Sequence, residues 1–241
     1  DGQSNTRVLM VTMRTPGDDI ALVKGWLASS GLVSVEQLLS VQHVGQSPRQ
    51  DVVSNRVLIT LKPGVNVDMS SVSHIDYTNA SCGVCGQQSI EQLLENLPER
   101  VEHSPICIPV SAVFSLTEAL QQQQPAFART GGCHGAALFD ESLRLLDVKE
   151  DVGRHNAVDK LIGANMDRVS ESVGMVVSGR VSFEIVQKAA MARVGMIIAI
   201  GAPTDLAVEL ACECDIAMIG FVKRNGFNLY HGQSQLLGKQ G

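Results

Sequence analysis

Long apolar runs are absent from this sequence of 241 residues. No stretch reaches the roughly 18 to 20 consecutive apolar residues that a membrane-spanning helix needs. No charged-then-apolar segment typical of an export signal opens the chain. The sequence therefore predicts a cytoplasmic protein with no membrane partner.

An excess of positive charge is also missing. Lys and Arg number 19 against 25 Asp and Glu, which gives a net charge of −6. Proteins that bind nucleic acid broadly need a basic face, so we expect no nucleic-acid partner. The hydrophobic content of 44% and the charged content of 18% are typical of a globular chain.

Short apolar segments alternate with helical patterns in the second half of the chain. Residues 173–177, 196–200 and 216–222 have the pattern of buried strands. Residues 182–194 and 204–213, which lie between them, have the pattern of helices. This alternation predicts an α/β fold with a parallel sheet whose two faces are covered.

The N-terminal part has the pattern of a small α+β unit. Residues 7–13 and 52–61 have the apolar density of strands. Asp18 or Asp19 can cap a helix that Gly31 then ends. We therefore expect a separate small domain at this end of the chain.

Three parts are expected along the sequence. A small α+β domain covers residues 1–80, a cysteine loop with connecting helices covers residues 81–125, and an α/β domain covers residues 126–241. In the middle part, helices are expected to start at Ile90, from a capping-box pattern, and after Ser115.

A hairpin and a helix are expected at the start of the α/β domain. The hairpin covers residues 135–148 and turns at residues 140–142. The helix covers residues 156–169 and carries apolar residues at helical spacing.

Polar and glycine-rich residues gather where the predicted strands end. Residues 178–180, 201–204 and 223–226 each follow a strand, and residues 149–160 follow the hairpin. Ligands of open α/β sheets bind outside the carboxyl ends of the strands, so these four loops are predicted to line one crevice. Glycines allow close backbone approach and cations suit phosphate, which favours a phosphorylated ligand. The cations are Arg154, Arg180, Lys223 and Arg224, and the candidate acceptors for a guanine or ribose edge are Asp151, Asp159 and Asp205.

Each of these residues also has an ordinary structural interpretation. Arg154 can pair with Asp151 or Glu150, and neighbouring backbone can satisfy His134 and His155. Glycine-rich turns after strands are common connections in α/β folds. Their combined placement at one sheet edge favours a ligand site, but it leaves the ligand unidentified.

Six cysteines in a chain without an export signal favour reduced or catalytic thiols over a disulfide framework. Cys82 and Cys85 form a C-x-x-C motif, which could bind a metal, form a redox disulfide or carry sulfur. A closed zinc site needs four ligands, but Cys212 and Cys214 lie in a predicted helix and are interpreted as small buried residues. The remaining two are Cys107 and Cys133.

Two other chemistries fit the cysteine pattern poorly. A zinc deaminase needs H-x-E before its P-C-x-x-C, whereas His134 is followed by Gly135 and Ala136, and the C-x-x-C comes first. A thioredoxin-like pair follows a strand at a helix N-terminus, whereas Cys82 and Cys85 are flanked by small loop residues. A thiolate on such a loop suits handing a group from one protein to another.

Motifs spread over nearly the whole chain resemble one known family. They are SCGVCG, TGGCHGAAL, EDVGRHNAVDKLIG, SGRVSFEIVQKAAMA, GAPTDLAVELA and GFVKRNGFNLY, together with MRTPGDD near the start. Their content and order resemble the formate dehydrogenase accessory sulfurtransferase family. The resemblance implies a C-terminal domain similar to cytidine deaminases without their zinc chemistry.

The resemblance implies a sulfurtransferase that takes sulfane sulfur from a cysteine desulfurase as a persulfide. The implied acceptor is the molybdenum (or tungsten) bis(pyranopterin guanine dinucleotide) cofactor, held as bound substrate, with GDP as a mimic and with no structural metal. Formate dehydrogenase is the implied recipient, and a homodimer is the implied assembly. The alternatives are a non-enzymatic chaperone that only shields the cofactor and a thiol-disulfide oxidoreductase.

The resemblance also assigns residues. Cys82 and Cys85 match the family's C-x-x-C as catalytic residues, with Cys82 as the persulfide carrier and Cys85 assisting or sharing it. Cys133 stands where the family often has another residue, and we expect it to be incidental. The implied cofactor-binding residues are Thr130, Gly131, Gly132, Arg154, His155, Ser178, Gly179, Arg180, Phe221, Val222, Lys223, Arg224, Asn225 and Gly226.

Overall fold

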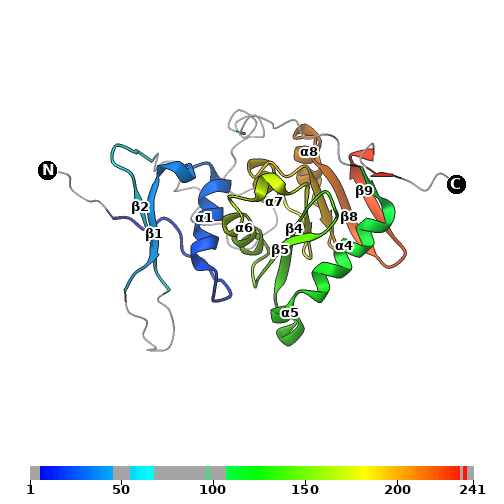
Figure 1. Ribbon diagram of the computed structural model, residues 1–241, viewed down its shortest axis with the longest axis horizontal. Coiled ribbons are helices and arrows are strands. Elements are labelled where there is room, and N and C mark those ends of the chain that lie inside the picture. The colour runs from blue at the N-terminus through cyan, green and yellow to red at the C-terminus, as the bar shows by residue number, and fades with distance from the viewer. Residues whose placement is uncertain (1–5, 46–54, 68–96, 98–106, 234–235, 238–241) are drawn as a thin grey trace.

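A six-stranded mixed β-sheet forms the centre of the computed structural model, which describes residues 6–45, 55–67, 97, 107–233 and 236–237. The strand order is β5-β4-β6-β7-β8-β9 (Figure 1). The strands are β4 (His134–Phe139), β5 (Leu145–Asp151), β6 (Gly174–Val177), β7 (Met196–Ala199), β8 (Ala217–Lys223) and β9 (Gly226–His231).

The sheet is mixed, and the parallel arrangement predicted for residues 173–177, 196–200 and 216–222 is confirmed in its central strands. β6, β7 and β8 run parallel, because a helix between each pair returns the chain to the same end. β4, β5 and β9 run antiparallel to their neighbours, and hairpins connect β4 to β5 and β8 to β9. The first hairpin is confirmed, whereas β9 was not predicted, since its half-buried residues do not form an apolar run.

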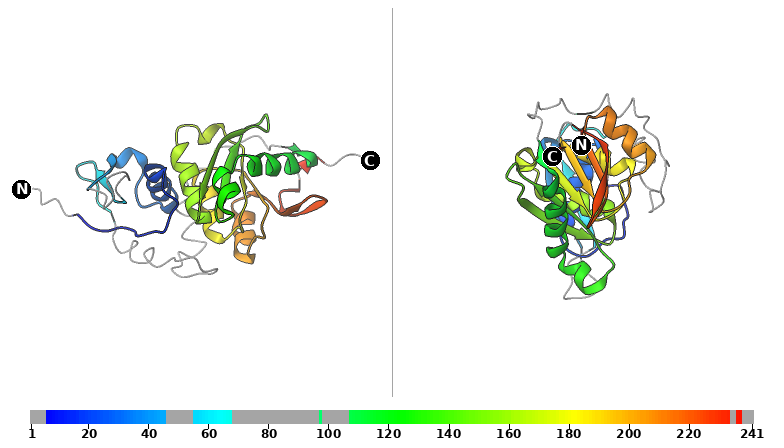
Figure 2. Two further views of the ribbon diagram at one scale, coloured as in Figure 1. Left: turned by 90° about the horizontal axis from the view of Figure 1, so that it is seen from below. Right: turned by 90° about the vertical axis from the view of Figure 1, so that its right-hand side faces the viewer.

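Helices cover both faces of the sheet, as Figure 1 and Figure 2 show. One face packs against α6 (Arg154–Ala164), α7 (Phe183–Met191) and α8 (Asp205–Glu213), and the other packs against α4 (Val110–Gln122). None of the helices in the described part of the chain is long and apolar enough to cross a membrane. The smaller elements are α5 (Pro125–Thr130), η2 (Val169–Glu171), β3 (Ile108–Pro109) and β10 (Leu236–Leu237).

Two helices differ from their predicted bounds. α4 begins directly after Pro109 and not after Ser115, because an extended proline is well suited to precede a helix. α6 ends well before residue 169, since the side-chain amide of Asn165 donates to the Leu161 carbonyl at 2.8 Å and competes with further helical bonds.

The N-terminal elements form a helix and a two-stranded hairpin. They are α1 (Asp19–Ser30), η1 (Val35–Gln37), β1 (Leu38–His43) and β2 (Val57–Leu61). α1 has the predicted bounds, and Gly31 ends it with φ 69°. Residues 7–13 are not a strand, contrary to prediction, because β1 and β2 pair with each other and leave Val8 and Val11 exposed.

α1 packs directly on α6 (Figure 1), and a glycine of each helix lies at the contact. A Cβ on Gly25 would overlap the backbone oxygen of Asp159, and one on Gly163 would overlap that of Ala21. The buried Asp159 carboxylate also accepts from Lys188 of α7 at 2.7 Å. From α1, the Ser29 hydroxyl donates to the same carboxylate at 3.0 Å. The N-terminal helix is therefore held on α6 by backbone contact and by a hydrogen bond to the buried ion pair between α6 and α7.

Replacing Gly163 by alanine is expected to destabilise the protein by about 2 kcal/mol, because the added methyl group would push α1 away from α6. For a chain of this length, the melting temperature should fall by about 4 to 8 °C in thermal denaturation. Gly195→Ala is the matched control, since a Cβ there would have nothing nearer than 3.7 Å. Equal melting temperatures of the two variants would contradict the close approach of the helices.

Candidate functional site

The predicted ligand loops meet at one edge of the sheet. The strand register pairs His134 with Asp151. It also pairs Val177 with both Ala136 and Ala199. The loops after β6, β7 and β8 therefore share an edge with the start of β4 and the end of β5, as predicted. This edge, called the rim below, comprises residues 130–135, 151–155, 178–182, 201–204 and 221–226.

Backbone contacts at glycines hold the rim loops together. A Cβ on Gly201 would lie 2.5 Å from the carbonyl oxygen of Gly179, so a side chain does not fit there. The Gly201 carbonyl also accepts the Phe221 N–H at 3.0 Å. Between β6 and β4, the Ser178 hydroxyl accepts the Gly135 N–H at 2.9 Å. Loops adjoining β4, β6, β7 and β8 are thus joined in one row.

Arg154 lies at the rim with an unsatisfied N–H group. Its Nε is buried and has no hydrogen-bond partner among the described residues. Asp151, one partner considered for it, is fully buried and pairs with Lys160 at 2.7 Å. Glu150, the other, accepts two N–H groups of the first turn of α5 at 2.8 Å. In the part of the chain that the structure describes, Arg154 therefore forms an ion pair with neither Asp151 nor Glu150.

Two neutral histidines lie beside this arginine. The pKa of His155 is lowered to about 4, chiefly by burial and then by the charge of Arg154. Its Nε2 lies 2.8 Å from Ser182 Oγ, so a side chain and not the backbone satisfies it. Burial, followed by Arg154 and Arg180, also lowers the pKa of His134. Near pH 7, the positive charge at this end of the rim therefore resides on the two arginines.

The loop before β4 forms an exposed turn. Thr130 ends α5, and Gly131 terminates that helix with φ 64°. The Thr130 hydroxyl donates to the Ala126 carbonyl at 2.7 Å and accepts the Gly132 N–H at 3.1 Å. These bonds shape the loop and leave its three predicted binding residues exposed next to Cys133 at the rim.

The N-terminal segment reaches the rim at Thr15, a residue that the sequence did not single out. The Thr15 N–H donates to Asp151 Oδ2 at 3.0 Å, and its carbonyl accepts from Lys160 Nζ at 2.8 Å. Its hydroxyl accepts the Val152 N–H at 2.9 Å and lies 3.7 Å from Cys133 Sγ. Thr15 belongs to the MRTPGDD motif, which was the available signal for it.

Phe221 adopts a left-handed backbone conformation within β8, with φ 54°. For a residue other than glycine this conformation costs about 1 to 2 kcal/mol. It occurs where the β8–β9 register shifts between Gly220 and Lys223. The residue is 40% exposed. Backbone strain of this kind clusters at functional sites, which makes Phe221 a candidate ligand contact.

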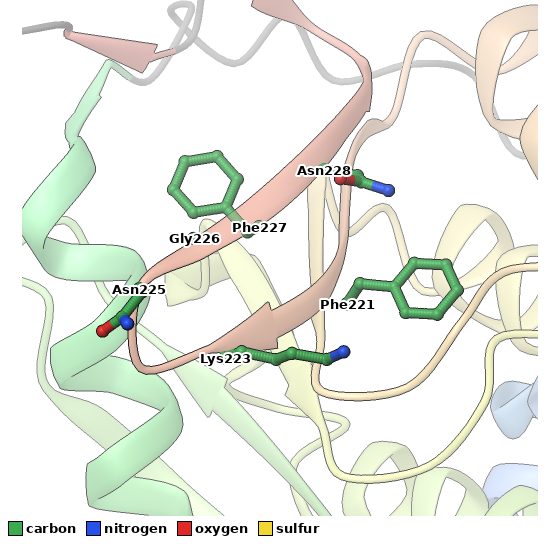
Figure 3. Close-up of a pocket in the computed structure, with 6 residues that line it drawn as sticks. All are labelled: Phe221, Lys223, Asn225, Gly226, Phe227 and Asn228. Atoms are coloured by element: carbon green, nitrogen blue, oxygen red, sulfur yellow. The ribbon is translucent and has the colours of Figure 1, made fainter.

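An open hollow of about 420 Å³ lies around the β8–β9 hairpin (Figure 3). Figure 3 shows Phe221 and Lys223 on one side of the hairpin and Phe227 on the other. Val222, which was assigned to the binding site, is 6% exposed and belongs to the core, so its side chain cannot contact a ligand. The hollow is lined by Phe221, Lys223, Asn225, Gly226, Phe227 and Asn228.

Two of the three candidate acceptor aspartates are not available to a ligand. Asp151 and Asp159 are buried and pair with Lys160 and Lys188. Burial raises the pKa of Asp159, and the Lys188 ammonium opposes this effect. Asp205 is exposed in the first turn of α8 and remains a candidate.

The cysteines differ in their surroundings. Cys82 and Cys85 lie outside the residues that the structure describes. Cys212 is exposed on α8, so its interpretation as a buried residue is wrong, and Cys214 is partly buried. Within the described ranges, no group of three or more His, Cys, Asp or Glu side chains could hold a metal ion.

Known proteins resemble this chain along nearly its whole length. The sequence matches the model of the FdhD/NarQ family over residues 3–237. A Streptomyces coelicolor relative named sulfur carrier protein FdhD is 38% identical over 239 residues, which cover 96% of this chain and 84% of the relative. A Mycobacterium tuberculosis protein of the same name is 38% identical over 234 residues, which cover 94% of this chain and 85% of the relative.

The fold is also similar to that of a solved structure. A crystal structure from Desulfotalea psychrophila, described as a candidate formate dehydrogenase accessory protein, has a TM-score of 0.69 at 20% identity. The similarity covers 94% of this chain and 83% of the chain in that crystal structure. At that identity the likeness concerns the fold alone. Because the family model spans nearly the whole chain and the curated relatives agree with it, this protein belongs to the FdhD/NarQ family.

Proposed function

We propose that this protein is a sulfurtransferase. It accepts sulfane sulfur from a cysteine desulfurase as a persulfide and transfers it to the molybdenum (or tungsten) bis(pyranopterin guanine dinucleotide) cofactor of formate dehydrogenase. The name of the relatives, sulfur carrier protein FdhD, supports the transfer of sulfur. The observation that carries the cofactor-binding half is the convergence of cationic and glycine-rich loops on the rim.

Cys82 and Cys85 are the proposed sulfur-carrying residues, supported by the C-x-x-C motif and by the family. The Cys82 thiolate attacks the outer sulfur of the donor's persulfide, so that a new S–S bond forms while the donor's S–S bond breaks and the donor leaves as a thiolate. Cys85 then attacks the inner sulfur of the Cys82 persulfide, which releases hydrosulfide to the metal and leaves a disulfide. A dithiol reductant reopens that disulfide.

The rim offers groups that suit a guanine dinucleotide. Arg154 and Arg180 present guanidinium donors, which bind phosphate oxygens in a bidentate manner. Gly132 leaves its backbone open to close approach by a ligand. Near the hairpin, Phe221 exposes an aromatic ring and Asn225 an amide, which can stack on a base and bond to its edge.

We further propose a homodimer in which the second subunit or a docked partner covers the sulfur-bearing loop. An exposed persulfide would be lost to small thiols by exchange. We also propose that residues 126–241 keep a cytidine-deaminase-like arrangement without its zinc chemistry. The sequence after His134, which lacks the glutamate of H-x-E, supports this loss.

A non-enzymatic chaperone is the second candidate, because the cations and glycines of the rim are complete without Cys82 and Cys85. Mass spectrometry after incubation with a desulfurase and cysteine separates the two functions. A gain of one sulfur on the peptide that contains residues 82–85 supports transfer. A stable disulfide between the two cysteines, without added sulfur, would indicate a thiol-disulfide oxidoreductase.

The Cys82→Ala variant is expected to abolish activation of formate dehydrogenase while GDP binding stays intact, because the thiolate carries sulfur and the rim binds the nucleotide. Enzyme activity after maturation and calorimetry with GDP measure the two properties. Cys212→Ala, which removes an exposed thiol from α8, is the matched control and should retain activation. Full activation by the Cys82 variant would refute the assignment.

The Arg180→Ala variant is expected to weaken GDP binding about tenfold, because a charge-assisted hydrogen bond contributes about 1.5 kcal/mol or more. Calorimetry measures the affinity. Arg144→Ala is the control, since Arg144 is also exposed but pairs with Asp140 in the hairpin turn at the opposite edge of the sheet. An affinity that is unchanged by the first substitution removes Arg180 from the site.

The Phe221→Gly variant is expected to separate binding from stability. GDP affinity should fall about tenfold with loss of base stacking, which contributes about 1 to 3 kcal/mol. The free energy of unfolding should change by less than about 1 kcal/mol, because glycine relieves the left-handed strain and offsets the lost packing. Phe221→Tyr keeps the ring and should keep the affinity. Equal GDP affinities of all three proteins would exclude stacking on this ring.

A further inference from the structure

We propose that His134, Arg154 and Arg180 form a subsite for a doubly charged tetrahedral oxyanion, and that His134 takes up a proton when the anion binds. In the natural ligand this place is taken by the diphosphate of a guanine dinucleotide, whose two tetrahedral phosphates carry one negative charge each, an identity that rests on the proposed function. The subsite itself rests on the contacts of His134 and Arg154 at Gly179, on the buried unpaired Nε of Arg154, and on the exposed Arg180 that follows Gly179.

Gly179 allows the histidine and the first arginine to come together. It is buried, and a Cβ built on it would lie 3.2 Å from His134 Nδ1 and 3.3 Å from Arg154 Cβ. The two side chains therefore close over this backbone from β4 and from α6. Arg180 is the next residue along the chain and is exposed. Any side chain at position 179 would push these groups apart.

Arg154 has an N–H group, at Nε, that donates to no acceptor among the described residues. Its Nε is buried without a partner there. A buried donor left unpaired costs about 1 to 3 kcal/mol, and more when the group is charged. A bound anion would supply the missing acceptor and would be drawn by the same charge.

The carboxylates near His134 are already engaged. Asp151, its cross-strand partner, accepts from Lys160 at 2.7 Å and from the Thr15 N–H at 3.0 Å. Glu184 is engaged with Ser182 and His155, and the charge of Arg154 also helps to lower its pKa. Among the described residues, however, no carboxylate forms an ion pair with Arg154 or Arg180, so both guanidinium groups can bind an anion from outside. The titratable and charged groups around His134 are Asp151 on β5, Arg154 and His155 on α6, and Arg180 after β6. Glu184 and Lys188 on α7 act on the neighbouring His155.

The uptake of a proton by His134 follows from the change in local charge when the anion binds. In the free protein, burial and the two arginines lower the pKa of His134, so its imidazole is neutral near pH 7. A bound dianion offsets the guanidinium charges and favours the imidazolium form, which raises the pKa in the complex. Affinity for the anion must then rise as pH falls through the interval between the free and bound values. Each unit between them corresponds to about tenfold in affinity.

Sulfate is the probe for the subsite, because it is a doubly charged tetrahedral anion that carries no titrating proton near neutral pH. In an NMR titration of the imidazole resonances, saturating sulfate is expected to raise the pKa of His134 by about one unit. The His134→Gln variant identifies the resonance by its loss. His231, at the opposite edge of the sheet, is the internal control, and sulfate should not shift its resonance. A His134 titration that saturating sulfate leaves unchanged overturns the proposal.

Calorimetry at several pH values tests the linkage independently. Sulfate affinity should fall about tenfold as the pH rises through the interval between the free and the bound pKa of His134. His134→Gln should flatten this dependence while His231→Gln keeps it. GDP and guanosine then separate this inference from the proposed function. If sulfate binding is linked to a proton and GDP binds no more tightly than sulfate, the result supports the subsite and removes guanine from the proposed function. Binding of GDP with no contribution from His134 overturns the subsite and leaves the proposed function standing.

Discussion

The buried ion pair between Asp151 and Lys160 is the interaction on which the site depends. The two side chains lie 2.7 Å apart and are 0% and 2% exposed. Removing either partner would leave a buried charge at a cost of about 3 to 5 kcal/mol. Asp151 also accepts from the backbone N–H groups of Thr15 and Gly153 and from the Asn156 amide. One carboxylate thereby joins the end of β5, the start of α6 and the N-terminal segment.

The same ion pair determines the charge of the rim. Because Lys160 and three further donors occupy Asp151, that carboxylate has no capacity left to neutralise Arg154. Glu150 is likewise engaged, since it caps α5. A local concentration of positive charge therefore persists in a chain whose net charge is −6. Such a focused patch in an acidic protein attracts a small anion, while the surrounding charge disfavours an extended polyanion.

Local patterning predicted much of the fold but less of the site. The apolar segments predicted as strands form β6, β7 and β8, because a short continuous apolar run is typical of a strand that is buried on both faces. The burial of Val222 was also within reach, since alternation along a strand places it opposite Phe221 and Lys223. The unpaired Nε of Arg154 could not be predicted from the sequence, because it arises only when Asp151 pairs with Lys160 and not with Arg154. Edge strand β9 was missed for a similar reason, since only its pairing with β8 makes it a strand.

Two proposed recognition features lie along the same rim, one around Gly179 after β6 and the other around Phe221 in β8. Neighbouring strands are about 4.8 Å apart, so two strand spacings separate these features by about 10 Å. A nucleoside diphosphate has an aromatic base at one end and charge at the other, and the rim presents a ring and cations in the same order. Gly201 lies between them, and its backbone contacts both. A side chain there would collide with the backbone of Gly179 and Arg180, so the same glycine that joins the loops also sets the spacing between the two features.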